Sequence, residues 1–173
     1  MTLFARGGAL ASDVLREHLL KSSDEQPMGS LLGTVVTYTG KSQEKVRNES
    51  FKACLFLARQ PHVGAACLAQ LVLGRPSQEQ GKSSSSSKKW RPLYGRLKIV
   101  AQMVFEFGFG EASGLNLRGV MDFAAPAFEH QNLQVRRAAV DLFVEAYMQQ
   151  SGPAEHYISG LKPALQVSLL RHV

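Results

Sequence analysis

The feature that most constrains the fold of this chain is a helical pattern that occurs more than once. Two segments share this pattern, KVRNESFKACLFLA at 45–58 and QVRRAAVDLFVEAY at 134–147. In each, a polar residue is followed by valine and then arginine, and small or apolar residues recur at helical spacing after them. A helix between these segments fits the same frame, so the pattern recurs at steps of 47 and 42 residues. The corresponding positions are Ser50, Leu97 and Ala139, then Cys54, Ala101 and Phe143, then Leu57, Val104 and Ala146, with Leu93 in the place of the valine.

Repeats of about 40–47 residues are typical of arrays built from helix pairs. Each pair has an apolar face that is too wide to bury alone, and stacking the pairs side by side buries these faces in one continuous core. No run of residues reads securely as a strand. The sequence therefore predicts an all-α solenoid of stacked helix pairs, with an irregular helical bundle whose helices share one pattern as the alternative.

Apolar periodicity, prolines, glycines and capping residues mark the expected helices. Gly74 can end one helix in a left-handed cap, Pro92 suits the first turn of the next, and Asn132 suits an N-cap. Pro126 is expected to kink the helix that contains it. The segment 30–39 would also suit a strand, because it contains several β-branched residues. The expected helices are 12–19, 30–39, 43–59, 62–73, 92–107, 115–130, 132–149, 154–159 and one that starts near 163.

One long polar segment interrupts this pattern. RPSQEQGKSSSSSKK at 75–89 has no periodicity, and it predicts a flexible insertion at about 75–90 in a single domain that spans 1–173. Hydrophobic residues make up 45% of the chain and charged residues 20%, which is ordinary for a folded protein and unlike a disordered one. The last residues, LQVSLLRHV, stop in the middle of an apolar pattern, so we expect a fragment of a longer protein.

The net charge of +6, from 20 Lys and Arg against 14 Asp and Glu, suggests an acidic partner. Nucleic acid, an anionic membrane and an acidic protein all fit that charge. No apolar stretch reaches about 18 residues, so no segment is expected to cross a membrane. Cys54 and Cys67 are the only cysteines, and we expect both to be reduced core residues of a cytosolic protein, with a disulfide between packed helices as the alternative.

The sequence lacks the patterns that catalysis or cofactor binding requires. Gly-Lys-Ser occurs at 40–42 and 81–83, but Val35 and Pro76 replace the glycine that a phosphate-binding loop needs five residues earlier. The five histidines lack metal-ligand spacing, and the serine run contains no G-x-S-x-G elbow. We therefore expect no enzyme activity, no metal and no cofactor.

Two motifs resemble known repeat proteins. The V-R-x-x-A opening, with Pro126 in the preceding helix, resembles HEAT repeats. KKWRPLYGR at 88–96 is similar to the tryptophan loop of TOG domains, which are HEAT arrays that bind tubulin. The stretch AFEHQNLQVRRAAVDLFVEAYMQ at 127–149 is most similar to the single TOG domains of centrosomal proteins at ciliary tips. The resemblance covers about residues 28–172, although this chain offers fewer helix pairs than a full TOG array and its tryptophan lies in the second recognisable pair.

In TOG domains the loops inside the helix pairs line one edge and bind tubulin. The expected pairing places these loops at 39–43, 75–90, 129–132 and 159–162, where their basic residues would form one ridge; lysines that are merely solvated are the alternative. Trp90 would anchor the ridge, because interfaces concentrate energy at tryptophans, or it would fold back over the core beside Pro92 and Tyr94. The candidate residues are Trp90, Lys88, Lys89, Arg91, Lys41, Asn132 and Lys162, with Lys82 and His130 in the same loops.

Arg47 and Arg136 follow the repeated valine, and we expect them to bind acidic side chains of the neighbouring repeat, with partner contact as the alternative.

The resemblance implies a non-enzymatic cytoplasmic module that binds αβ-tubulin or microtubules at microtubule ends, centrosomes, basal bodies or ciliary tips. A general HEAT scaffold that holds a protein or peptide in its groove is the second hypothesis. Nucleic-acid binding ranks last, because interleaved aromatic residues are lacking. Phosphates on the serine run would cancel the charge of Lys88 and Lys89.

Overall fold

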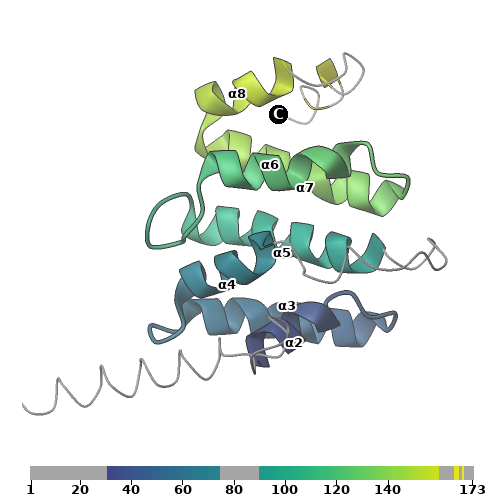
Figure 1. Cartoon of the computed structure of the whole chain (residues 1–173), viewed down its shortest axis with the longest axis vertical. Coiled ribbons are helices and arrows are strands. Elements are labelled where there is room, and N and C mark those ends of the chain that lie inside the picture. Colours follow the sequence, from purple (N-terminus) through teal and green to yellow (C-terminus); the bar gives the residue numbers. More distant parts are fainter. Residues whose placement is uncertain (1–30, 75–89, 160–165, 168, 170–173) are drawn as a thin grey trace, which may run out of the picture.

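The structure, a computed structural model, describes residues 31–74, 90–159, 166, 167 and 169. These residues form helices and no strand beyond one isolated bridge, so the all-α class is confirmed for the described part of the chain (Figure 1). The segment that would also suit a strand is helical. The helices are α2 (Leu31–Tyr38), α3 (Glu44–Arg59), α4 (Gly64–Leu73), α5 (Trp90–Phe107), α6 (Leu117–Phe128), α7 (Leu133–Gln149) and α8 (Ser151–Ser159).

Some expectations fall on residues that the structure does not describe. They are the helix at 12–19, the insertion at 75–89 with its serine run, and the helix expected from about 163. The single domain over 1–173 therefore stays a prediction.

The helices stack as successive pairs along the long axis of Figure 1. α2 packs on α3, α4 on α5 and α6 on α7, which are the pairs expected from the repeat. The second helices of the pairs, α3, α5 and α7, run in the same direction and contact one another in turn; we call them the second-helix layer. The first helices, α2, α4, α6 and α8, also contact one another in turn and form the other layer. This arrangement confirms the solenoid of helix pairs.

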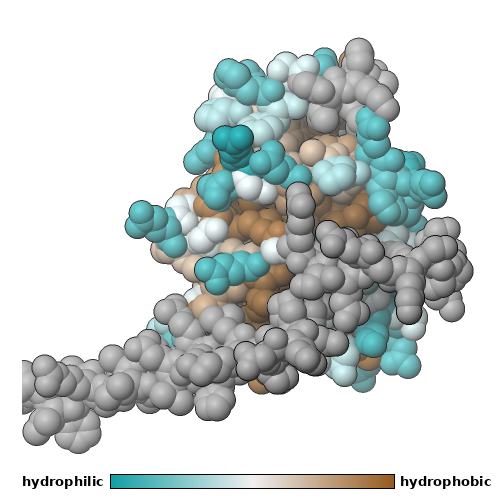
Figure 2. All heavy atoms as spheres, in the orientation of Figure 1, coloured by the Kyte–Doolittle hydropathy of each residue, from teal (hydrophilic) through white to brown (hydrophobic). Residues whose placement is uncertain are grey.

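The core is one continuous cluster between the two layers, from Leu32 in α2 to Leu169. The repeat positions Ser50, Leu97 and Ala139 are all buried, so the sequence pattern marks equivalent places in successive pairs. Phe128 and Phe143 pack edge to face near the end of the stack, with 6.5 Å between ring centroids. On the face drawn in Figure 2, apolar side chains gather over the middle of the stack. Because the pairs share this core, each stabilises its neighbours.

Both cysteines are buried free thiols, as expected, and they form no disulfide. Burial raises the pKa of Cys54 to about 12, because an apolar environment disfavours the thiolate. Cys54 therefore acts as a core side chain.

Local signals in the sequence predict two helix ends correctly and two wrongly. Asn132 caps α7 by accepting a hydrogen bond from the Gln134 N–H at 2.8 Å, and Pro92 lies in the first turn of α5. Pro126 lies within α6 as expected. The helix expected from 154 begins earlier, because Ser-Gly-Pro at 151–153 forms the first turn of α8 and the interruption after α7 is confined to Gln150. Proline suits that first turn, where its missing N–H is not needed.

The left-handed cap expected at Gly74 is also wrong. Gly74 has φ −56° and ψ 143°, an extended conformation that other residues adopt too. Arg96 of α5 explains the difference, because its Nε donates to the Val72 carbonyl at 2.7 Å and its Nη2 to the Gly74 carbonyl at 2.5 Å. A side chain from the partner helix thus satisfies carbonyls that a left-handed turn would otherwise satisfy.

Candidate partner-binding edge

The loops inside the helix pairs lie at one edge of the stack, as the pairing predicts. Figure 1 shows the α2–α3 and α6–α7 loops at the edge where α5 begins, and the connections between pairs at the opposite edge. We call residues 38–43, 90–95 and 129–132 the intra-pair edge. Four candidate residues lie on it, Lys41, Trp90, Arg91 and Asn132, whereas Lys82, Lys88, Lys89 and Lys162 lie outside the described residues.

The α2–α3 loop packs directly on the first turns of α5. A Cβ atom on Gly40 would lie 2.8 Å from Cα of Pro92, and one on Gly95 would collide with the side chain of Thr39. Real Cβ atoms do not approach other atoms so closely, so both positions require glycine. This close approach brings Lys41, next to Gly40, beside the turn of α5 that carries Trp90 and Arg91.

Trp90 is half-buried and takes part in two ring contacts. Its indole meets Tyr94 edge to face, with 5.8 Å between ring centroids and 69° between the planes. The Arg91 guanidinium carbon lies 5.1 Å from the centroid of the same indole. Trp90 thus packs beside Tyr94 and the core, while part of its surface stays accessible to solvent. An aromatic ring held in this way loses little conformational entropy when it binds a partner.

Two further cation–ring contacts lie on this edge or next to it. Lys41 Nζ lies 5.2 Å from the centroid of the Tyr38 ring, and Lys98 Nζ lies 5.9 Å from the centroid of the Tyr94 ring. Each ring attracts its cation through the negative face of its π system. Tyr38 is 44% exposed and was missed from the sequence, where the only signal is an aromatic residue three positions before Lys41.

The expected roles of Arg47 and Arg136 are wrong. Arg47 Nη1 donates to the carbonyls of Lys41 and Ser42 at 3.1 and 2.6 Å. Arg136 Nη1 donates to the carbonyls of His130 and Gln131 at 2.8 and 2.9 Å. Each arginine therefore binds the loop that precedes its own helix, rather than an acidic side chain of the next repeat. We call these contacts the arginine clamps; they hold equivalent loop residues in two different pairs.

The middle pair has a different arrangement, because Tyr94 stands in α5 where the clamp arginines stand in α3 and α7. A tyrosine has one hydroxyl and cannot reach two carbonyls as an arginine does. Trp90 occupies the position of the N-cap residues Gln43 and Asn132, and it packs on Tyr94 instead of capping the helix. The middle pair thus replaces a polar clamp with an aromatic contact.

The described His130 and Asn132 side chains shape their own loop. The Asn132 backbone N–H donates to His130 Nδ1 at 3.0 Å, while the Asn132 side chain caps α7. Asn132 is half-buried. Its polar side chain therefore orders the α6–α7 loop, and partner contact by Asn132 stays a prediction.

Cations gather at the start of the second helices. Lys45, Arg91 and Arg137 lie in the first or second turn of α3, α5 and α7, and they make no ion pair with another described residue. A helix N-terminus already carries partial positive charge, so cations placed there destabilise the isolated fold slightly. An acidic partner at this edge would relieve that repulsion.

In the part of the chain that the structure describes, no three His, Cys, Asp or Glu side chains are grouped as metal ligands would be. No described helix combines the length and apolar character that a membrane span requires.

Comparison with known proteins places this fold beside that of TOG domains. A structure of the TOG domain of human Cep104 superposes with a TM-score of 0.63 at 20% sequence identity, covering 84% of this chain and 53% of that chain. A second CEP104 TOG domain structure gives a TM-score of 0.63 at 18% identity, covering 94% of this chain and 64% of that one. This chain thus spans about half to two thirds of their length. No protein-family model and no curated protein sequence matches. The similarity confirms the TOG-like solenoid expected from the sequence.

Proposed function

We propose that this protein is a non-enzymatic module that binds αβ-tubulin or microtubules through its intra-pair edge. The observation that carries the proposal is the placement of Trp90, Arg91 and Lys41 together at the edge of a fold similar to that of TOG domains. In the TOG family this edge is the tubulin-binding one. Lys88, Lys89 and Lys162, which the structure does not describe, and Asn132 remain proposed contacts on the same edge.

The edge would recognise an acidic protein surface by charge and by one aromatic anchor. Arg91 and Lys41 would pair with carboxylates, and the cations at the helix starts would raise the association rate by long-range attraction. Trp90 would bury its remaining exposed surface against the partner. Because exposed charges are screened within about 10 Å at 0.1 M salt, the affinity should fall as salt rises.

Binding without chemistry suits a protein that holds tubulin at a particular place. We propose that the place is the cytoskeleton, at microtubule ends, centrosomes or ciliary tips. Phosphorylation of the serine run, next to Lys88 and Lys89 in the sequence, would add negative charge and weaken the contact.

Size-exclusion chromatography of the 173-residue chain with purified αβ-tubulin tests the proposal. We expect a complex that weakens with salt, is weakened by Lys41→Glu with Arg91→Glu, and is lost when Trp90→Ala is added. Arg118→Glu on α6 is the matched charge control, because Arg118 is exposed and has its weak ion pair within its own helix. Thermal unfolding of each variant separates lost contacts from lost structure.

Two results would overturn the proposal. A complex that survives the variants at Lys41, Trp90 and Arg91 would place tubulin on another surface. No complex at any salt concentration would favour a scaffold that binds a different protein.

A further inference from the structure

A groove lies on the second-helix layer, between α3 and α5. It has a volume of about 650 Å³ and is lined by Glu44, Lys45, Asn48, Glu49, Phe51, Lys52 and Lys98. Of its α3 residues, Phe51 is half-buried and packs against the core, and the others are exposed. The groove therefore belongs to the outer surface of the array and does not include Lys41, Trp90 or Arg91.

Two of the three lysines in this groove have no ion-pair partner among the described residues. Lys52 Nζ is paired with Glu49 Oε1 at 3.0 Å, so these two charges largely cancel. Glu44 lies in the first turn of α3, where the helix terminus favours a carboxylate. Lys45 and Lys98 have no ion pair with another described residue, and Lys98 Nζ lies over the face of the Tyr94 ring. The groove thus presents two available ammonium groups.

Two exposed phenylalanines lie nearer the C-terminal ends of the same two helices, outside the lining of the groove. Phe56 is 60% exposed and follows Lys52 by four residues on α3; Phe105 is 62% exposed and follows Lys98 by seven on α5. These spacings place each phenylalanine on the same helix face as its lysine. Phe51 at the groove itself is half-buried. Large exposed apolar side chains that form one patch are typical of an interaction surface.

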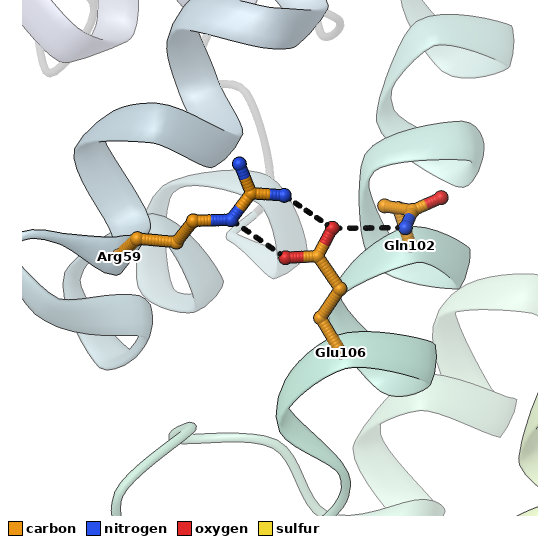
Figure 3. A network of polar contacts seen from close by, with 3 residues as sticks. All are labelled: Arg59, Gln102 and Glu106. Atoms are coloured by element: carbon orange, nitrogen blue, oxygen red, sulfur yellow. Dashed lines mark hydrogen bonds and ion pairs between the residues drawn. The ribbon is translucent and has the colours of Figure 1, made fainter.

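An ion pair holds the two helices together where the phenylalanines lie. Arg59 of α3 binds Glu106 of α5 through two parallel hydrogen bonds, at 2.9 and 2.7 Å, and Gln102 donates to the same carboxylate at 2.9 Å (Figure 3). Arg59 follows Phe56 by three residues, and Glu106 is next to Phe105. This planar, two-bonded geometry fixes the relative position of the helix ends. The surface is therefore preorganised.

We propose that the α3–α5 groove docks an acidic segment of a partner protein that also carries apolar side chains. Carboxylates of the segment would pair with Lys45 and Lys98, and its apolar side chains would cover Phe56 and Phe105. This surface lies outside the intra-pair edge, so the inference goes beyond the proposed function. Nucleic acid is a poorer occupant, because its backbone carries a phosphate at every nucleotide and needs an uninterrupted basic surface, whereas Glu44 and Glu49 separate the lysines of this groove.

Fluorescence anisotropy with labelled synthetic peptides tests this proposal on the 173-residue chain. The probe is a short peptide with a glutamate-rich half and a leucine- and phenylalanine-rich half. Two control peptides replace its glutamates by lysines or its apolar residues by serines. We expect the probe to bind, both controls to bind more weakly, and Lys98→Glu with Phe105→Ser to weaken the probe by about tenfold or more.

A variant on another surface helps to locate the site. Arg118→Glu should leave peptide affinity unchanged, since Arg118 lies on α6 and does not line the groove. Lys45→Glu should weaken the probe as Lys98→Glu does, and because both lysines are exposed, neither substitution should unfold the protein. Thermal unfolding of both variants and the parent chain checks that the fold is kept.

Several outcomes would overturn the proposal. They are a probe that binds no better than the control peptides, an affinity that the groove variants leave unchanged, and an affinity that falls equally in Arg118→Glu. Displacement of the probe by a DNA oligonucleotide at equal concentration would indicate a nucleic-acid surface. Self-association in analytical ultracentrifugation that disappears in Phe105→Ser would assign the surface to a second copy of this chain.

Discussion

Replacing Arg136 by glutamine removes one arginine clamp, and Arg137→Gln is the matched control. The two residues are adjacent in α7 and carry the same charge, but Arg137 is exposed whereas Arg136 binds the carbonyls of His130 and Gln131. A difference between these variants therefore reports the clamp and not the net charge.

The expected loss follows from the two hydrogen bonds. A hydrogen bond from a charged donor stabilises a folded protein by about 1.5–3 kcal/mol when it is buried. Here the carbonyls belong to a surface loop and can bind water once the arginine is gone, so we expect a total loss of about 1–2 kcal/mol. In a domain of this size each kcal/mol lowers the melting temperature by about 2–4 °C, which predicts a decrease of about 2–8 °C.

Arg137→Gln should leave stability unchanged or raise it slightly. It removes a cation near a helix N-terminus, where the helix dipole repels positive charge. A charge of the favourable sign at such a place stabilises a helix by about 0.3–1 kcal/mol. Thermal unfolding by circular dichroism measures both variants. Amide hydrogen exchange adds a local readout, because loosening of the loop in Arg136→Gln should speed exchange at Asn132 and Gln134. Equal melting temperatures, or unchanged exchange at these amides, would refute the clamp.

Three further predictions concern the rest of the fold. The hydrogen bond from Arg59, helped by one from Gln102, lowers the pKa of Glu106. The ionised Glu106 should therefore stabilise the fold above the unfolded-state pKa of about 4.3, and this stability should be lost as pH falls through the lowered folded-state pKa. Urea midpoints should drop less on acidification in Arg59→Gln than in the parent chain, and parallel curves would contradict this. Gly114→Ala should destabilise by about 1–2 kcal/mol or more in chemical unfolding, because Gly114 has φ +66° and a Cβ atom would lie 2.8 Å from the backbone of α4, whereas Gly152→Ala, with open space around it, should not. Phe143→Ala should cost about 3–5 kcal/mol in the same assay, since the ring is fully buried, and a loss below about 1 kcal/mol would mean that the core is not continuous there.

The fold was predictable because its signal is distributed over many residues. A repeated pattern of buried positions such as Ser50, Leu97 and Ala139 determines which helix faces meet, and that pattern survives local exceptions. The Asn132 cap was predictable for a different reason, because a cap joins atoms only a few residues apart.

The contacts of the candidate site were less predictable. Every residue carries a backbone carbonyl, so nothing in the sequence shows that Arg47 and Arg136 bind carbonyls of their own loops rather than carboxylates. The extended Gly74 depends on Arg96, which lies far from it in the chain. Tyr38 was missed because periodicity identifies helices but does not show which aromatic side chain at a helix end remains exposed.

The close packing of Gly40 on Pro92 makes one rigid body of two segments that are far apart in the sequence. Lys41 and Trp90 therefore do not need to be ordered separately when a partner binds. The loss of rotational and translational freedom is incurred once for both, so the second contact forms as an intramolecular step at high effective concentration. A bulkier residue at position 40 would separate the two segments, and weak contacts that are adequate together would then act singly.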